Sequence, residues 1–193
     1  MAELECVSDA DQDMALVELF RTGDCAAFDA LFHRHKDGVY SLVYRILGPE
    51  AADDMAQEAF TQIYKALPRF RGDSAVKTWI YRITLNVCRD SLRRKMRSPS
   101  LVLTEAPNPV DEACDVTDET ARLWEREELK RAIDTLSEAE RAAVELHYFQ
   151  GLSYAEMALV LNCPVGTIKA RVHTAITTLR QKLNHLLAEV DEQ

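Results

Sequence analysis

Aromatic and cationic side chains alternate closely between residues 69 and 82, around a loop that contains a glycine. Exposed rings stack on unpaired bases, at about 1–3 kcal/mol for each base, while neighbouring cations contact phosphates. The same mixture could hold a base that has been turned out of a duplex. The residues expected to contact melted nucleic acid in this way are Phe70, Arg71, Lys77, Trp79 and Tyr81. For Trp79 we favour the alternative, a buried position in the core of a small helical domain.

A row of hydrogen-bond donors follows on the same predicted helix, from about residue 74 to 96. Apolar residues set one face of that helix, at Ile80, Ile83 and Val87. Another face carries side chains at positions i, i+4, i+7 and i+11, which are Arg82, Asn86, Arg89 and Arg93. Like charges on one helix face repel each other unless an anion neutralises them. The pattern therefore favours a surface for a polyanion over a merely solvated face.

A second candidate site lies in residues 151–180, which are typical of a helix-turn-helix. Ser153 and Glu156 have the spacing of a capping box, which predicts a helix start. Asn162 tolerates a left-handed turn and Pro164 ends the helix, so a new helix is expected at Pro164 or Val165. One face is apolar, at Leu161, Val165, Ile168, Val172, Ala175 or Ile176, and Leu179, and the opposite face carries Lys169, Arg171, His173, Thr174 and Thr177. An amphipathic hairpin is the alternative, but the short turn favours a reader of duplex DNA.

The elements that must position these residues are helical. Period-two alternation is absent over any useful length, so we expect an all-α fold without a sheet. Further helices are expected from Phe28 to Ile46, ended by Gly48-Pro49, and from Ala56 to Leu67, ended by Pro68. In the second half, helices are expected at 120–136 and at 137–149, where Ser137 and Glu140 repeat the capping box.

Charge divides the 193-residue chain, whose net charge is −9. Residues 1–29 hold eight acids and one base, whereas residues 61–97 hold ten bases and two acids. A basic block in an acidic protein indicates contact with a polyanion. Residues 98–119 hold three prolines and six acids, as in a flexible linker. We expect an acidic tail at 1–13, a helical domain at 14–97, the linker at 98–119 and a second small helical domain at 120–193.

Several classes of protein are disfavoured. The sequence has no run of about eighteen apolar residues, and its N-terminus is acidic. We therefore expect a cytoplasmic protein that does not insert into a membrane. The five cysteines are scattered without a C-x-x-C pair, which predicts reduced thiols. His33 and His35 face apart on a helix, so no metal site and no cofactor are expected.

Three segments together resemble the extracytoplasmic-function group of bacterial sigma factors. FRGDSAVKTWIYRITLNVCRD resembles the family's promoter-melting segment, and DDMAQEAFTQIYKAL resembles its helix that docks on the RNA polymerase clamp. YFQGLSYAEMALVLNCPVGTIKARVH resembles its helix-turn-helix. The likeness covers nearly the whole chain outside the first dozen residues and the linker.

The resemblance implies a dissociable specificity subunit without catalysis of its own. Its implied partners are core RNA polymerase, promoter DNA as duplex and melted strand, and an anti-sigma protein, often membrane-bound. The implied polymerase contacts are Asp53, Asp54, Gln57, Glu58 and Phe60. The loop from Phe70 to Val76, with Asn86 and Asp90, would capture a flipped base of the minus-ten element. At the minus-thirty-five element the implied contacts are His147, Lys169, Arg171, His173 and Thr174. Two DNA-binding modules that each bind weakly bind more tightly when they are linked, because each has a high effective concentration near its site once polymerase holds both.

The chain departs from the family at the second reader. Many relatives have more basic residues where this chain has Thr174, Ile176, Thr177 and Thr178, and an arginine is frequent at the position of His147. Ala170 also lacks a hydroxyl that relatives often have there. Either the phosphate contacts at the upstream site are weaker, or its preferred sequence is unusual.

Two other functions compete with this interpretation. A dimeric helix-turn-helix regulator would bind duplex DNA without polymerase. A nucleic-acid hydrolase could use Asp53 and Asp54, but adjacent carboxylates on a helix point roughly 100° apart and no metal-binding histidine accompanies them. An exposed apolar docking surface tends to find a partner, so the two modules could also contact each other in the free protein.

Overall fold

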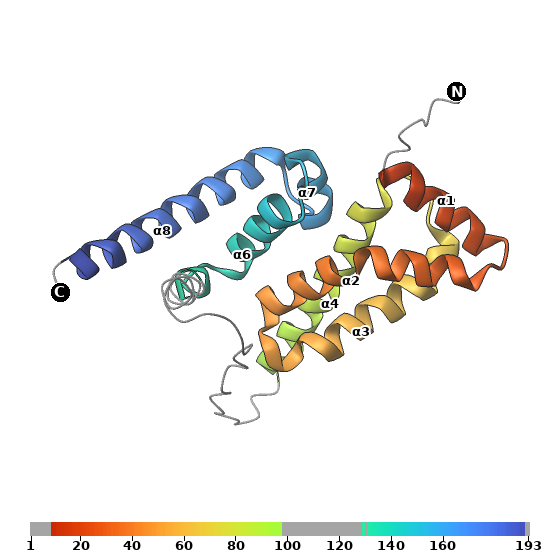
Figure 1. Cartoon of the computed structure of the whole chain (residues 1–193), viewed down its shortest axis with the longest axis horizontal. Coiled ribbons are helices and arrows are strands. Elements are labelled where there is room, and N and C mark those ends of the chain that lie inside the picture. The colour runs from red at the N-terminus through yellow and green to blue at the C-terminus, as the bar shows by residue number, and fades with distance from the viewer. Residues whose placement is uncertain (1–8, 98–128, 130, 192–193) are drawn as a thin grey trace, which may run out of the picture.

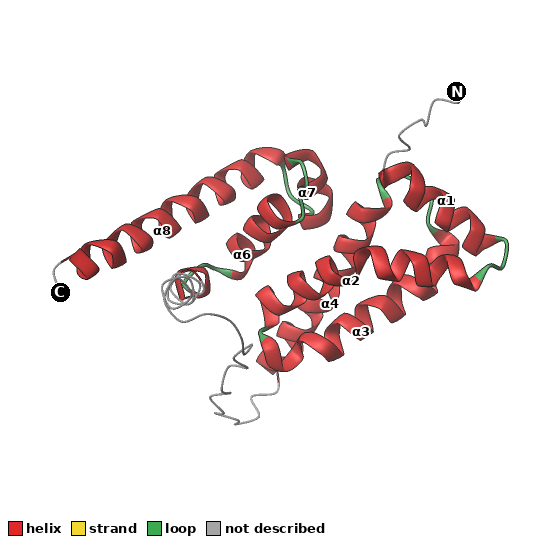
Figure 2. Cartoon of the chain, in the orientation of Figure 1, coloured by secondary structure: helices red, strands yellow, loops and turns green. Residues whose placement is uncertain are grey.

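The computed structural model describes residues 9–97, 129 and 131–191, and every regular element in these ranges is a helix (Figure 1, Figure 2). The helices form two modules, as the sequence predicts. The N-terminal module contains residues 9–97 and the C-terminal module contains residues 131–191. The expected linker at 98–119 and most of the helix expected at 120–136 lie outside the described residues.

The N-terminal module contains four α-helices, which the local sequence delimits well. They are α1 (Asp9–Arg21), α2 (Cys25–Leu47), α3 (Pro49–Ala66) and α4 (Val76–Arg97), with a 3₁₀ turn η1 (Leu67–Arg69) after α3. The Asp24 side chain accepts a hydrogen bond from the Ala26 N–H and so caps α2. Gly48 ends α2 with φ of 82°, a left-handed value that suits glycine, and Pro49 begins α3.

Helix α1 begins at Asp9, so the acidic tail ends earlier than the expected boundary after residue 13. The reason is a buried ionic cluster between α1 and α2. Asp13 is 2% exposed, and its two carboxylate oxygens lie 2.7 Å from Arg34 Nε and 2.8 Å from His35 Nε2. Burial alone raises the pKa of Asp13, but the bonds from His35 and Arg34 outweigh it and hold that pKa below its ordinary value.

The C-terminal module contains the predicted helix-turn-helix. Its helices are α6 (Glu138–Val144), a π-helical turn η2 (Glu145–Phe149), α7 (Tyr154–Leu161) and α8 (Val165–Asp191). Both predicted capping boxes are present, at Ser137 with Glu140 and at Ser153 with Glu156. Asn162 has φ of 51° and closes α7 in the left-handed conformation expected for it. The short turn between α7 and α8 is therefore built as predicted.

The apolar face of α8 is confirmed except at its first residue. Ile168, Val172, Ala175 and Leu179 are buried. Val165 is 39% exposed, so its prediction as a core residue is wrong. As the first residue of α8 it lies where the chain leaves the turn, one helical turn before the buried stripe begins.

The capping box at Ser153 allows a direct test. Replacing Ser153 with alanine removes the acceptor for the Glu156 N–H and is expected to lower the free energy of unfolding by about 1 kcal/mol. Urea denaturation monitored by circular dichroism measures this change. Thr174→Ala, an exposed substitution within α8, is the control and should leave the midpoint nearly unchanged. Equal losses in both variants would contradict a specific role for the cap.

The two modules pack against each other and share one hydrophobic core. Helix α2 contacts α6 and η2, and α4 contacts α7 (Figure 1). Ile80 and Leu85 of the N-terminal module belong to the same buried cluster as Leu146, Leu152 and Met157 of the C-terminal module. A smaller cluster, which includes Ile133, Ala175 and Leu179, lies within the C-terminal module alone. The sequence analysis left undecided whether the two modules contact each other, and in the structure they do.

Candidate nucleic-acid interface

Helix α4 presents the predicted row of donors to solvent. Arg82, Asn86 and Arg93 are exposed and Arg89 is partly buried. Asp90 is also exposed on this helix, and its Oδ1 lies 3.7 Å from Arg93 Nη1. The opposite side of α4 is packed, with Ile80, Leu85, Val87 and Cys88 in the core. Burial raises the pKa of the Cys88 thiol to about 12, so this cysteine is protonated and unreactive at neutral pH.

Phe70 and Tyr81, two residues expected to contact melted nucleic acid, are core residues, and so is Trp79, for which a buried position is the favoured prediction. Phe70, Trp79 and Tyr81 are 4%, 8% and 2% exposed. The Phe70 and Trp79 rings pack on each other with centroids 5.1 Å apart. The predicted burial of Trp79 is therefore confirmed. The predicted exposure of Phe70 and Tyr81 is wrong, because both rings are buried as well. Trp79 and Tyr81 lie on the packed side of α4, and Phe70 follows η1 directly, so all three rings belong to the main hydrophobic cluster.

Cationic and polar side chains remain around the loop before α4. A cavity of about 240 Å³ lies there, lined by Arg69, Phe70, Arg71, Asp73, Ser74, Trp79, Arg82 and Leu159. Arg71 and Arg82 are exposed at this cavity. Leu159 comes from α7 of the C-terminal module and stands 51% exposed at the same place.

Lys77 and Tyr81, two more of the predicted contacts, are directed toward the C-terminal module. Lys77 Nζ donates to the Gln150 carbonyl oxygen at 2.6 Å, and the Tyr81 hydroxyl donates to Gln150 Oε1 at 2.5 Å. Burial, and then the nearby Glu145 carboxylate, raises the pKa of Tyr81 well above its ordinary value. Tyr81 therefore stays a protonated donor at all physiological pH values.

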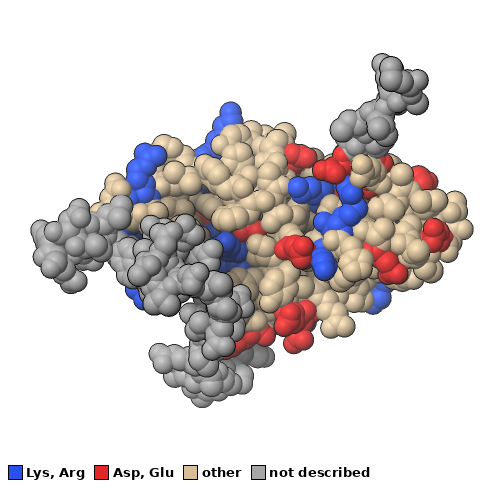
Figure 3. Space-filling view, in the orientation of Figure 1, with Lys and Arg blue, Asp and Glu red and all other residues tan. Residues whose placement is uncertain are grey.

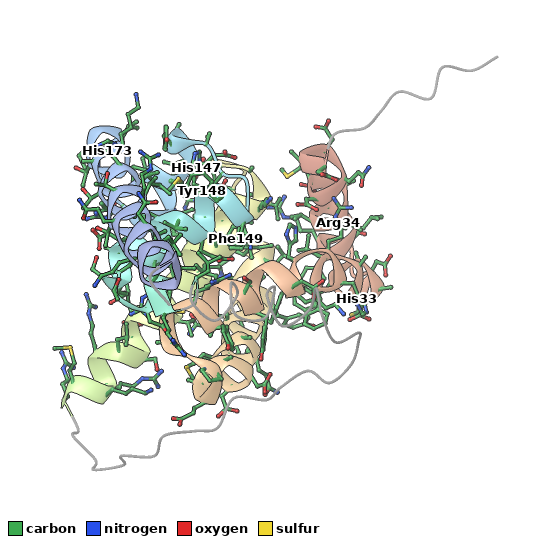
Figure 4. The ribbon with its side chains drawn as sticks, turned by 60° about the vertical axis from the view of Figure 1, so that its left-hand side comes forward. His33, Arg34, His147, Tyr148, Phe149 and His173 are labelled. Carbon is green, nitrogen blue, oxygen red and sulfur yellow. The ribbon has the colours of Figure 1, made fainter. Side chains whose placement is uncertain are left out.

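Helix α8 exposes part of the predicted duplex-reading face. Lys169, His173 and Thr174 are exposed, and His173 lies on the side of α8 directed away from the N-terminal module (Figure 4). On the face shown in Figure 3, Lys and Arg atoms stand along the upper edge of the C-terminal module, whereas acidic and basic atoms are interspersed over the N-terminal module. This arrangement suits contact with phosphates on the α8 side.

Arg171 and His147 are less available than the sequence predicts. Arg171 is partly buried, with Nη1 3.5 Å from Cys163 Sγ. The His147 Nδ1 lies 2.9 Å from the Leu152 carbonyl oxygen, and its ring stacks on Tyr154 with centroids 4.6 Å apart. His147 contacts the loop before α7, and Arg171 contacts the turn after it. Their expected contacts with DNA remain predictions, and these internal contacts would have to be kept or exchanged when DNA binds.

An apolar groove between α2 and α3 contains part of the predicted docking set. Its volume is about 690 Å³, and it is lined mainly by aromatic and charged residues, namely Phe28, Asp29, Phe32, Lys36, Asp37, Tyr40, Asp53, Ala56, Gln57, Phe60, Thr61, Tyr64 and Lys65. The predicted residues Asp53, Gln57 and Phe60 line it. Asp54 and Glu58 are exposed on α3 but outside the groove. Of the groove's aromatic residues, the sequence analysis assigned only Phe60 to this surface; it missed Phe28, Phe32, Tyr40 and Tyr64, although Tyr64 lies one helical turn after Phe60.

The described residues contain no group of three or more His, Cys, Asp or Glu side chains arranged to hold a metal ion. His33 is exposed while His35 is buried, which agrees with the prediction that they face apart. None of the helices in the described part of the chain is long and apolar enough to cross a membrane.

Comparison with known families supports the two-module division. The family model for sigma-70 region 2 matches residues 31–98, and the model for sigma-70 region 4 matches residues 126–179. The RNA polymerase sigma-H factor of Pseudomonas aeruginosa is 37% identical over 188 residues, which cover 93% of this chain and 97% of that protein. The ECF RNA polymerase sigma-E factor of Escherichia coli is 37% identical over 183 residues, covering 91% and 96%.

Two solved structures have similar folds. CnrH in complex with the cytosolic domain of CnrY is 26% identical, with a TM-score of 0.69 over 91% of this chain and 99% of that one. The sigma factor RpoE in complex with the anti-sigma factor NepR, from Bartonella quintana, is 22% identical, with a TM-score of 0.65 over 81% and 96%. The second likeness concerns the fold alone.

Proposed function

Because the chain belongs to the extracytoplasmic-function group of the sigma-70 family, whose members direct RNA polymerase to promoters, we propose that its two modules divide promoter recognition between them. In this proposal α4 and the loop before it contact the melted minus-ten element, and α8 contacts the minus-thirty-five element as duplex. The chain has no catalysis of its own and acts in the cytoplasm with core polymerase.

The observation that carries the proposal is the exposure of two donor-rich helix faces on separate modules. Arg82, Asn86 and Arg93 are exposed on α4, and Lys169 and His173 are exposed on α8. Phosphate contacts from such faces fix the register, and a few side chains at base edges add specificity. The burial of Phe70, Trp79 and Tyr81 changes the minus-ten part of the proposal. Recognition there rests on the cations and on the cavity beside Arg71 and Arg82, and requires no stacking on those three rings.

The groove between α2 and α3 is the proposed docking surface for core polymerase. Its apolar floor with charged edges suits a helix laid into a groove. Asp53 and Gln57 stand at its edge, and the half-exposed Tyr64 supplies an aromatic anchor of the kind that dominates binding energy.

A regulatory protein is the second proposed partner. CnrH, which is 26% identical to this chain, was solved with the cytosolic domain of CnrY bound, and RpoE was solved with the anti-sigma factor NepR. We therefore propose that an anti-sigma protein holds this chain inactive.

In vitro transcription tests the function. Purified core polymerase on a pool of promoter fragments is expected to start at new positions only when this chain is added, and those starts should share two spaced motifs. If the chain adds no starts but protects duplex sites by itself, a dimeric helix-turn-helix regulator replaces the proposal. Turnover of nucleic acid that depends on added metal would instead indicate an enzyme.

Lys169 gives a sharper prediction for the upstream contact. Lys169→Ala is expected to weaken promoter binding by the holoenzyme to a similar extent on all sequences, and to reduce the slope of log affinity against log salt by about 1. Lys182→Ala, also an exposed lysine on α8, is the control and should retain the wild-type slope. Binding measured across a salt series distinguishes them. A Lys169 variant with the wild-type slope would contradict phosphate contact at this position.

A further inference from the structure

The loop that leads into α4 carries part of the proposed minus-ten surface. Residues 70–75 connect η1 to α4 without a regular element of their own, and Arg71 and Asp73 are exposed there. Together with Ser74 and Arg82 they line the cavity of about 240 Å³. A side chain can distinguish one base from another only where the backbone beneath it is held in place. The contacts that hold this loop therefore affect which bases it can select.

Arg21, the last residue of α1, binds the first residue of this loop. Its Nη2 donates to the carbonyl oxygen of Phe70, which is 49 residues away in the sequence, and its Nη1 lies 2.5 Å from Glu18 Oε1. The Phe70 carbonyl group shares a planar peptide group with the nitrogen of Arg71. Holding that oxygen therefore fixes the orientation of the peptide group through which the chain enters Arg71.

Helix α1 also touches the loop at a second place. It contacts both η1 and α4, the elements that the loop connects (Figure 2). Gly72 has φ of 80°, and a Cβ built there would stand 3.4 Å from the terminal methyl group of Met14. Helix α1 is itself fixed on α2, because the buried Asp13 is bonded to Arg34 and His35. It is therefore a firm support for the loop.

The position of Arg21 at a helix end explains only part of these contacts. A basic residue in the last turn interacts favourably with the helix dipole, and an ion pair with the exposed Glu18 adds little stability. Neither effect requires the guanidinium to reach Phe70. The bond to Phe70 joins α1 to the loop that carries Arg71, so a change at Arg21 should be transmitted to that loop.

We propose that Arg21 is a positioning residue for minus-ten recognition. Without contacting DNA, it holds residues 70–75 in the conformation that selects bases of the melted strand. This inference rests on the proposed function for its consequence, whereas the support of the loop by Arg21 does not. Loss of the Arg21 side chain should leave the phosphate contacts of α4 in place and remove part of the base selection. Selection at the minus-thirty-five element, made by α8, should stay as it is.

Arg21→Ala in the full-length chain tests the proposal. Thr22→Ala is the matched control, because the Thr22 hydroxyl donates to the Leu19 carbonyl oxygen within the end of α1. Holoenzymes are assembled from core polymerase and each chain. They transcribe a pool of fragments randomised over both promoter elements, and sequencing of the transcripts gives the base preference at every position of the two motifs.

Arg21→Ala is expected to lower the preference for the favoured base about tenfold at one or more minus-ten positions, and to leave the minus-thirty-five motif unchanged. Thr22→Ala should match the wild type at both motifs. Unchanged selection in Arg21→Ala would overturn the proposal. So would an equal loss at both motifs, which indicates a general loss of structure.

The salt dependence of promoter binding separates positioning from direct contact. If Arg21 bound a phosphate itself, the slope of log affinity against log salt would fall by about 1 in Arg21→Ala. A positioning residue leaves the slope at its wild-type value. A reduced slope would therefore also overturn the proposal.

Hydrogen exchange of the free proteins, measured by mass spectrometry, tests the support of the loop without polymerase. Peptides that cover residues 70–75 should exchange faster in Arg21→Ala than in the wild type, while peptides of α3 should not change. Unchanged exchange in the loop would contradict the positioning role. If every chain, the wild type included, fails to give promoter-specific starts, the proposed function fails. The exchange result still decides whether Arg21 holds the loop.

Discussion

Replacing Tyr64 with alanine is expected to weaken binding of core RNA polymerase by about 30-fold, which corresponds to about 2 kcal/mol. The Tyr64 ring is 46% exposed at the groove, and its other edge packs on Phe20 and Phe28 at centroid distances of 5.3 and 4.9 Å. A ring held rigidly on one side and open on the other loses little conformational entropy when a partner covers it.

Fluorescence anisotropy or surface plasmon resonance with purified core polymerase measures the change. Tyr148→Ala is the matched control, because Tyr148 is 57% exposed but lies on the C-terminal module away from the groove. Its polymerase affinity should stay within about twofold of the wild type. If the two substitutions weaken binding equally, the groove between α2 and α3 is not the docking surface.

The second large effect is expected at Asp13. Asp13→Ala leaves His35 buried without its carboxylate partner and removes the 2.7 Å bond from Arg34, so the free energy of unfolding should fall by about 3 kcal/mol. Urea denaturation at neutral pH measures it. Asp54→Ala, an exposed carboxylate of the same module, is the control and should change stability by less than about 0.5 kcal/mol.

The Asp13 effect depends on pH in a direction that follows from its pKa. The folded-state pKa lies below the ordinary value of 3.8, so ionised Asp13 stabilises the fold above pH 3.8. That stabilisation is lost as the pH falls through the folded-state pKa. The difference between the wild type and Asp13→Ala should therefore persist from neutral pH to about 4 and shrink below it. A difference that grows on acidification would contradict this account.

Features set by neighbouring residues were predictable from the sequence. The capping boxes at Ser137 and Ser153, the left-handed Asn162 and the Gly48-Pro49 break all appear where expected. Each depends on groups within a few residues, so spacing alone carries the information. The two-module, all-α fold follows from the same local signals.

Features set by distant contacts were not predictable. Asp13 is buried against His35, which is 22 residues away in the sequence. Because Asp13 stands among other acidic residues, the sequence pattern did not indicate that it would be buried. Tyr81 is bonded to Gln150, 69 residues away, so its alternation with cations was misinterpreted as an exposed stacking surface. The stacking of the His147 ring on Tyr154 was likewise not foreseen. Aromatic residues near cations have the same pattern whether they bind a base or fill a core.

The hydrophobic core that crosses between the modules has a consequence for the lifetime of the protein. Each module has fewer than 90 described residues, and a domain of this size buries a modest share of its surface by itself. Leu146 and Leu152 are buried in the cluster that contains residues of both modules, so separation would open part of that cluster to solvent. Chains that are neither closed nor held by a partner therefore present apolar surface to proteases and chaperones. The total amount of this protein in a cell would then depend on the supply of its partners as well as on the rate at which it is made.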